Sequence, residues 1–393
     1  MRKQRSNNDK DVLEPAQGTV SWESPANIAI IKYWGKYPVQ LPMNPSLSFV
    51  LKNSRVKIRM DYSIHPSDDF RLDDFSINGN PHHAFKQRIA GYLKELTQYF
   101  PFLQHACLRI ESTSTFPHSA GIASSAAAFS ALALCLCSID TKIRSGRSVP
   151  GNRTPGRGSA SCKGSTKEGI KAATPASPDE FFHKASFMAR LGSGSACRSV
   201  YDGMVVWGKT PYLQSSSDEY AVRLGDRLVH PDFFTLRDAV LIVDSREKKV
   251  SSSAGHALMH RHPYKSARKN QAGNNLERLF NALREGDFHA FGEVAENEAL
   301  SLHSLMMSSD PGYTLMHPNS LRLIEKIREY RHEADIPLYF TMDAGPNVHL
   351  LYPSAYADRV LALIRGELAE LCEDERWIDD AMGQGPVKLS EED

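Results

Sequence analysis

Residues 116–129, FPHSAGIASSAAAF, restrict the fold more than any other segment, because their pattern is that of a tight turn leading from a strand into a helix. A β-type run, residues 108–111, precedes the turn, and a weakly polar run, residues 123–139, follows it. The second run carries four serines and falls short of the roughly 20 apolar residues that span a bilayer. We therefore predict a buried helix within a mixed α and β domain.

The start of this predicted helix is a candidate anion site. Small residues let a ligand approach the backbone, and a helix start offers unpaired N–H groups and the positive end of the helix dipole. We expect a polyphosphate and its metal ion to be surrounded by Ser119, Gly121, Ser124 and Ser125, with Ser125 as the metal ligand. No lysine follows the glycine, so this is not the GxxxxGK[ST] loop. The alternative is that the serines only cap a buried helix.

The same segment resembles the ATP loop of the GHMP small-molecule kinase superfamily, with the pattern P-x-x-x-G-x-x-S-S-A. Ala123, which we place in the ATP-binding loop, narrows the resemblance to one family within the superfamily. Most kinases of that superfamily have Gly at this position, giving GLGSSAA, whereas diphosphomevalonate decarboxylases have GLASSAA. Residues 121–127 match the decarboxylase form except at Ile122.

A second group of polar residues surrounds a short apolar strand near the amino terminus. Residues 24–36, SPANIAIIKYWGK, contain Asn27, Lys32, Tyr33 and Lys36. Two lysines and a tyrosine just past a strand end can form a socket for an anion. The alternative is a pair of surface lysines beside core aromatic residues. The string resembles the A-P-V-N-I-A-x-x-K-Y-W-G-K of the decarboxylase family.

Two departures from the family pattern lie beside this segment. The family usually continues YWGK with Arg-Asp, where this chain has Tyr37 and Pro38, and Pro45 replaces a serine in LPMNPSLS, residues 41–48. Both lie near the expected substrate entrance. They leave open whether the substrate carries one phosphate or two.

A third Gly/Ser-rich segment, residues 191–203, ends in an arginine that can bind a carboxylate. Ser193 and Ser195 are candidates to bind phosphate oxygens, and the guanidinium of Arg198 can make two parallel hydrogen bonds to a carboxylate. GSGS alone is also found in ordinary linkers. The segment resembles the family's R-x-GSGSACRSxxGG, with Asp202 where the family has Gly. Cys197 is expected to pack rather than to act as a nucleophile.

One carboxylate stands at the end of an apolar strand in residues 339–347, YFTMDAGPN. Asp343 is either a turn-forming residue or a catalytic group. Residues 340–347 resemble the family's YTFDAGPN, whose aspartate orients or deprotonates the tertiary hydroxyl of the substrate. Residues 77–79 with Arg88 resemble an LNG and a helix arginine that contacts substrate phosphates, although Arg88 is equally a candidate for a solvated helix residue.

The resemblance implies a two-lobed GHMP kinase fold of mixed α and β class, with an ATP-binding α/β lobe, a carboxy-terminal ferredoxin-like lobe and the site in the cleft between them. The activity it implies is ATP-dependent decarboxylation of mevalonate 5-diphosphate to isopentenyl diphosphate, with ATP and Mg²⁺ as cofactors and a homodimer as the assembly. Asp343, Arg198 and Lys32 are then the catalytic residues. The remaining substrate-binding candidates are Asn27, Tyr33, Lys36, Arg88, Ser193 and Ser195.

Charge and cysteine content restrict partners and location. The formal charge of +1 gives no global basic field, so we expect no nucleic-acid or membrane partner. Six cysteines without CxxC pairs favour a reducing, cytoplasmic location. The histidines show no metal-ligand spacing, and residues 256–262 place three of them in polar surroundings, so no structural zinc is predicted.

The chain is expected to divide near residue 235. Residues 1–18 read as a flexible tail, 19–235 as the first lobe and 236–393 as the second. Within the first lobe, residues 141–178 hold eight Lys or Arg against one Glu among small polar residues, which indicates a mobile basic insertion.

Smaller elements follow from periodicity. Strands are expected at 27–31, 46–51, 55–62, 239–243 and 338–342, and helices at 84–100, 264–285, 287–305 and 320–332.

Two other functions compete with the decarboxylase interpretation. A mevalonate-type GHMP kinase would phosphorylate without decarboxylating, and the joint presence of Lys32, Arg198 and Asp343 argues against it. A non-catalytic scaffold could recruit an acidic partner through the basic insertion. No aromatic residues are interleaved with those basic residues, which argues against a base-stacking surface.

Overall fold

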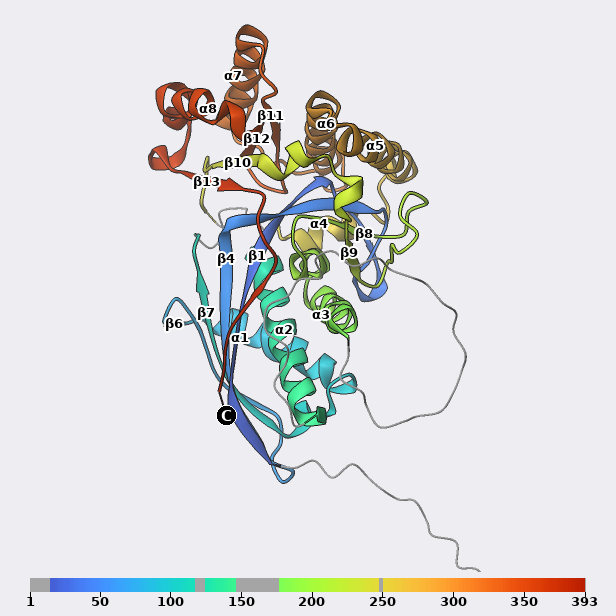
Figure 1. Ribbon diagram of the computed structural model, residues 1–393, viewed down its shortest axis with the longest axis vertical. Coiled ribbons are helices and arrows are strands. Elements are labelled where there is room, and N and C mark those ends of the chain that lie inside the picture. The colour runs from blue at the N-terminus through green and yellow to red at the C-terminus, as the bar shows by residue number, and fades with distance from the viewer. Residues whose placement is uncertain (1–14, 117–123, 146–176, 247–249, 393) are drawn as a thin grey trace, which may run out of the picture.

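The computed structural model describes residues 15–116, 124–145, 177–246 and 250–392. Figure 1 shows two lobes, with the long strands β1 and β4 in one and helices α5 to α8 in the other. The predicted ATP-loop residues Ser119, Gly121 and Ala123 lie outside the described residues, as does most of the predicted insertion.

The first lobe is built on a mixed eight-stranded sheet. The strands follow the order β14-β1-β4-β7-β5-β6, and β8 joins β4 to β9. Their bounds are β1 Ala16–Ile31, β4 Ser46–Ile64, β5 Arg71–Ile77, β6 Asn80–Pro81, β7 Ala106–Ser114, β8 Met204–Trp207, β9 Ala221–Arg223 and β14 Val387–Glu392. A separate two-stranded ribbon pairs β2 Lys36–Tyr37 with β3 Leu41–Pro42.

Alternating apolar residues explain the long strand β4. Val56, Ile58, Met60, Tyr62 and Ile64 are buried, because side chains two residues apart lie on the same face of a strand. The amino-terminal part of β4 pairs with β8 and its carboxy-terminal part with β7. The expected strands 46–51 and 55–62 are therefore two parts of one strand.

Three helices pack on one face of this sheet (Figure 1): α1 His83–Glu95, α2 Ser124–Ser145 and α3 Pro178–Gly192. Helix α2 contacts β1 and β4, and its alanines, such as Ala126, Ala127 and Ala131, are fully buried. Among the described residues, it is the one helix long and apolar enough to cross a membrane, but 83% of the qualifying window is buried. It is a core helix, as predicted.

The second lobe contains a four-stranded antiparallel sheet in the order β11-β12-β10-β13. Its strands are β10 Leu236–Leu241, β11 Tyr339–Thr341, β12 Val348–Pro353 and β13 Trp377–Ala381. Its helices are α4 Ser252–Leu258, α5 Lys265–Glu285, α6 Phe288–Met307, α7 Pro318–Ala334 and α8 Ala357–Leu363. Helices between β10 and β11 and between β12 and β13 complete the β-α-β-β-α-β arrangement, which confirms the ferredoxin-like fold.

The two lobes are joined by packing and by the last strand. A small apolar cluster contains Trp34 and Met43 from the first lobe and Met259, Leu302 and Ala344 from the second. Strand β14 returns to the first sheet and pairs with β1. The chain after residue 235 therefore contributes to both sheets, whereas the predicted division assigned all of it to the second lobe.

Several predicted boundaries differ from the structure, and three of the differences have consequences for the fold. Residues 16–18, placed in the tail, begin β1, because they pair with the end of β4. Helix α2 continues through Ser145 into the predicted insertion. Helix α1 ends at Glu95 rather than near residue 100, and 3-10 turns follow it. Pro101 disfavours helical geometry at Phe100, so the helix does not continue past that residue.

Candidate active site

The site forms where the end of β1 meets the turn after β11. Lys32 follows the last residue of β1, and its Nζ lies 3.0 Å from Asp343 Oδ1, across the junction between the lobes. Lys32 Nζ also donates to the backbone oxygen of Ala29 at 2.6 Å. The Lys32 side chain is 2% exposed and that of Asp343 is 27% exposed, so the carboxylate is accessible to a ligand and the amine lies behind it.

Burial sets the electrostatics of this pair. Desolvation lowers the pKa of Lys32, and Asp343 and Glu298 oppose this by favouring the charged amine. Arg198 adds a further lowering effect because it is a second cation nearby. The fixed charges around the amine therefore partly compensate for its loss of hydration.

Arg198 is held in the first lobe by one amide and one hydroxyl. Its Nε donates to Asn27 Oδ1 at 3.1 Å and one terminal nitrogen donates to Ser46 Oγ at 2.6 Å. Asn27 in turn donates to Ser199 Oγ and to the backbone oxygen of Ser195. Burial lowers the pKa of the Arg198 guanidinium, and the nearby Asp343 carboxylate opposes this effect. The structure therefore places Lys32, Arg198 and Asp343 in one site.

Tyr33 carries a buried hydroxyl that has no hydrogen-bond partner within the described part of the chain. Its ring packs 4.6 Å from the ring of Trp207 and 4.4 Å from that of His256. Gly194 permits this approach, since a Cβ there would lie 2.8 Å from the Tyr33 hydroxyl. Burial raises the pKa of Tyr33, so the hydroxyl stays protonated and can donate to a ligand.

Lys36 and Arg88 form a second cationic group. Lys36 Nζ donates to Gln40 Oε1 at 2.9 Å, and partial burial together with the charge of Arg88 lowers the pKa of Lys36. Arg88 is exposed, with its guanidinium carbon 4.8 Å from the ring centroid of Phe129. Two cations that disfavour each other's charge are stabilised by a bound polyanion.

The two Gly/Ser-rich segments meet at the start of α2. Ser125 Oγ lies 3.5 Å from Ser193 Oγ, and Ser124 precedes it as the first residue of the helix. The backbone oxygen of Ser195 accepts a hydrogen bond from the Asn27 amide at 3.2 Å.

Several residues at the site were missed by sequence reasoning. His256 was placed in polar surroundings, but it is 8% exposed and packs between Tyr33 and Trp34. Burial lowers its pKa to about 3, so it is neutral and its Nδ1 accepts from the Gly35 backbone N–H. Glu298 and Arg268 were also missed, because nothing in a helix pattern distinguishes a buried ion pair from solvated charges.

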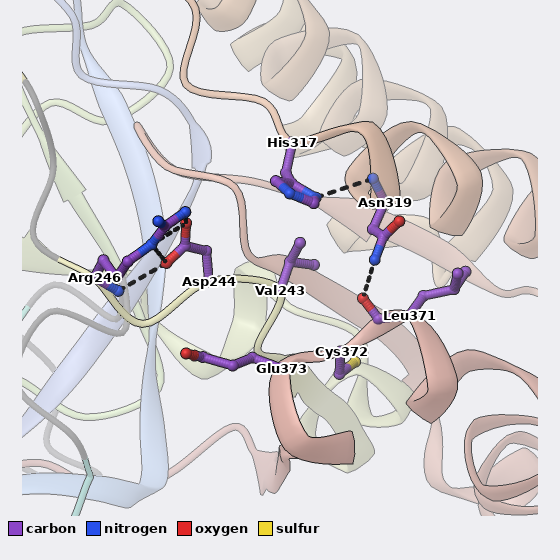
Figure 2. Close-up of a pocket in the computed structure, with 8 residues that line it drawn as sticks. All are labelled: Val243, Asp244, Arg246, His317, Asn319, Leu371, Cys372 and Glu373. Carbon is purple, nitrogen blue, oxygen red and sulfur yellow. Dashed lines mark hydrogen bonds and ion pairs between the residues drawn. The ribbon is translucent and has the colours of Figure 1, made fainter.

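A separate cavity of about 210 Å³ lies in the second lobe. Figure 2 shows Asp244 and Arg246 at one side of it and His317 and Asn319 at the other. Asn347, which ends the turn carrying Asp343, accepts hydrogen bonds from the Val243 and Asp244 backbone N–H groups. The cavity thus lies beside the residues that hold this turn in place, and none of the predicted site residues that the structure describes lines it.

Family models match nearly the whole chain. The diphosphomevalonate decarboxylase-like N-terminal domain matches residues 24–175 and 159–219, and the mevalonate 5-diphosphate decarboxylase C-terminal domain matches residues 239–391. The chain belongs to the diphosphomevalonate decarboxylase family.

Relatives and solved structures agree with the family. Diphosphomevalonate decarboxylase of Saccharomyces cerevisiae is 29% identical over 365 residues, which cover 88% of this chain and 81% of that protein. The human enzyme is 26% identical over 351 residues, covering 85% and 76%. The crystal structure of mevalonate diphosphate decarboxylase from Staphylococcus aureus superimposes with a TM-score of 0.75 at 26% identity, covering 95% of this chain and 99% of that one.

A structure of MDDEF in complex with MVAPP, the ATP analogue AMPPCP and magnesium has a TM-score of 0.74 at 26% identity, covering 95% of this chain and all of that one. In the present decarboxylase-family chain, the donor set fits such ligands. The Tyr33 hydroxyl, which no other described residue binds, and the cations Lys36 and Arg88 suit phosphate oxygens, and the serine hydroxyls at the start of α2 suit a nucleotide.

The magnesium fit depends on oxygen donors. Within the described residues, no group of three or more His, Cys, Asp or Glu side chains could hold a metal ion. Mg²⁺ is commonly bound through one or two protein oxygens together with substrate phosphates and water. The Ser125 hydroxyl is suited to be one such oxygen.

Proposed function

We propose that this chain catalyses the ATP-dependent decarboxylation of mevalonate 5-diphosphate to isopentenyl diphosphate, with release of ADP, phosphate and CO₂. The observation that carries the proposal is the contact between Lys32 and Asp343 across the lobes, with Arg198 electrostatically coupled to both. Membership in the decarboxylase family supports it. The reaction uses ATP and Mg²⁺.

Phosphorylation of the tertiary hydroxyl is assigned to Asp343 and Lys32. The accessible carboxylate of Asp343 accepts or steers the hydroxyl proton. Lys32 pairs with that carboxylate at 3.0 Å and stabilises the phosphoryl group as it moves. Mg²⁺, held by Ser125 and the nucleotide phosphates, supplies charge neutralisation when bound.

Decarboxylation is assigned to Arg198. When the new phosphate leaves with its bonding electron pair, positive charge develops at the tertiary carbon. The electron pair of the adjacent carbon–carboxylate bond then forms the double bond, and CO₂ is released. Two Arg198 nitrogens already donate to Asn27 and Ser46, which fixes the guanidinium so that its remaining nitrogen can orient the carboxylate.

The distal diphosphate is assigned to Tyr33, Lys36 and Arg88, with Ser193 and Ser195 beside them. Binding at this distance from the reacting carbon holds the substrate in place for both steps. Asn27 acts through Arg198. Ser119, Gly121, Ala123 and Ser124 are assigned to ATP.

Product analysis tests the reaction. With ATP and mevalonate 5-diphosphate, we expect CO₂, ADP and phosphate in equal amounts, and much slower turnover with mevalonate 5-phosphate as the matched control. Production of ADP without CO₂ would assign the chain to the kinases instead. Absence of both products would reject the proposal.

Replacing Tyr33 by Phe is expected to raise KM for mevalonate 5-diphosphate by about tenfold or more, with a small change in kcat, because a hydrogen bond to a charged group is lost. The Tm should not fall, since the hydroxyl has no protein partner within the described residues. Tyr352→Phe, in β12 of the second lobe, is the control and should leave KM unchanged. An unchanged KM for Tyr33→Phe would assign this hydroxyl to packing alone.

We infer a homodimer in the cytoplasm, without nucleic-acid or membrane partners, from the family resemblance and the near-zero net charge. Light scattering coupled to size-exclusion chromatography tests the dimer, and a monomer at micromolar concentration would reject it.

A further inference from the structure

A buried ion pair lies directly behind the catalytic lysine. Arg268 of α5 donates to both oxygens of Glu298 of α6, at 2.7 and 2.6 Å. The two side chains are 2% and 0% exposed. Asn275 also donates to Glu298, at 2.7 Å, so this carboxylate is held from two positions on α5.

The ion pair contacts the backbone of Lys32 on both sides. The Lys32 backbone N–H donates to Glu298 Oε2 at 2.8 Å, and the Lys32 backbone oxygen accepts from Arg268 at 3.0 Å. Both contacts cross from second-lobe helices to the end of β1. Asn44, from the first lobe, donates to the same backbone oxygen at 3.0 Å.

The same helix also contacts the backbone of the catalytic aspartate. His303 lies five residues after Glu298 on α6, and its Nε2 is 3.1 Å from the Asp343 backbone oxygen. Because a carbonyl oxygen only accepts, the His303 ring nitrogen is the donor. Helix α6 is thus bonded to the backbone of both members of the Lys32–Asp343 pair.

Stability alone gives little reason for this ion pair. Replacing a buried ion pair by apolar residues of similar volume is often neutral or stabilising, because desolvating two charges is costly. What apolar residues cannot do is bond to the N–H and the oxygen of one residue at the end of a strand.

We propose that Glu298 and Arg268 are positioning residues. They bind the backbone of Lys32 to helices α5 and α6 and so hold Lys32 at the distance from Asp343 required for phosphoryl transfer. This inference rests on the proposed function. It extends that function by making the docking of α5 and α6 against β1 a condition for assembling the catalytic pair.

Glu298 also contributes charge. The charged groups that act on the Lys32 amine are Asp343, from the turn after β11, Glu298 of α6, Arg198 of the first lobe and Asp238 of β10. Burial and Arg198 both lower the pKa of Lys32, and the negative charge of Glu298 opposes them. Removing that charge therefore lowers the pKa of Lys32 further. The proton on Lys32 is then lost at lower pH.

The primary test compares two substitutions on one helix. Glu298→Gln is expected to lower kcat by between about 10- and 100-fold, because misplacement of a reacting group by about 1 Å can cost 10²-fold. KM for ATP should change less than about twofold, and the alkaline limb of the kcat profile should move to lower pH. The control is Glu296→Gln, whose carboxylate pairs with Arg328 and Arg331 of α7, and it should keep kcat and the pH profile. Equal kcat and an unmoved alkaline limb for Glu298→Gln would overturn the proposal.

Two further measurements guard against a folding defect. The double variant Glu298→Leu with Arg268→Met replaces the pair by apolar side chains, and we expect retained Tm with lowered kcat. In the unaltered protein, hydrogen exchange should show the Lys32 amide protected as strongly as the β1 core. Rapid exchange at Lys32, or full kcat in the double variant, would reject the proposal. The exchange measurement needs no substrate, and inactivity of the unaltered protein would count against the proposed function alone.

Discussion

Replacing Asp343 by Asn is expected to lower ATP-dependent CO₂ release from mevalonate 5-diphosphate by about 10³-fold, within the range that general acid–base groups contribute. The amide keeps the size of the side chain but cannot accept the hydroxyl proton. It also removes the charge that pairs with Lys32 at 3.0 Å. Steady-state CO₂ and ADP release should fall together, because decarboxylation follows phosphorylation.

Asp358→Asn provides the control for this prediction. Asp358 is exposed in α8, and its replacement should leave the rate within about twofold, as is typical of surface positions. If Asp343→Asn retained ADP release while losing CO₂, the proton-accepting role would be wrong. The carboxylate would then act in the second step.

Replacing Lys32 by Met is expected to lower the rate by about 10²- to 10³-fold, because one preorganised charge is lost from a buried site. KM for ATP should change much less than kcat if the amine acts on the moving phosphoryl group. Lys57→Met, at an exposed position of β4, is the matched control and should retain full activity. A large rise in KM at constant kcat would show that Lys32 only binds substrate.

The unaltered enzyme gives an independent check on Lys32. Its pKa is lowered by burial, and the charged form is the active one in this mechanism. As pH rises through that pKa the amine loses its proton, so the rate should fall on the alkaline side below the range of an exposed lysine. In Lys32→Met this alkaline limb should be absent from the residual rate. A limb that persists would belong to another group.

Much of the fold follows from local patterns. The alternation in 55–62 and the alanine-rich run after residue 123 predict a strand and a core helix, and both are present. Helices at 264–285 and 287–305 agree closely with α5 and α6. The patterns did not reveal that β14 returns to β1, because a half-buried strand of six residues gives no information about its partner.

The site was also partly predictable, because several of its residues lie in recognisable local segments. Asp343, Arg198 and Lys32 each follow or lie within a recognisable segment, and the family resemblance connected them. Glu298, Arg268 and His256 have no such signal, because in the sequence a polar or charged helix residue is the same whether it faces water or a buried partner.

The sequence by itself determined the local elements, the Gly/Ser turns and the chemical groups available, because these depend on neighbouring residues and on spacing along the chain. Only the tertiary structure decided that a lysine at the end of β1 lies 3.0 Å from an aspartate 311 residues later, with one helix bonded to the backbone of both. Such contacts depend on how two lobes pack at a junction that no local pattern encodes, and the buried, partnered charges there hold a geometry rather than supply stability.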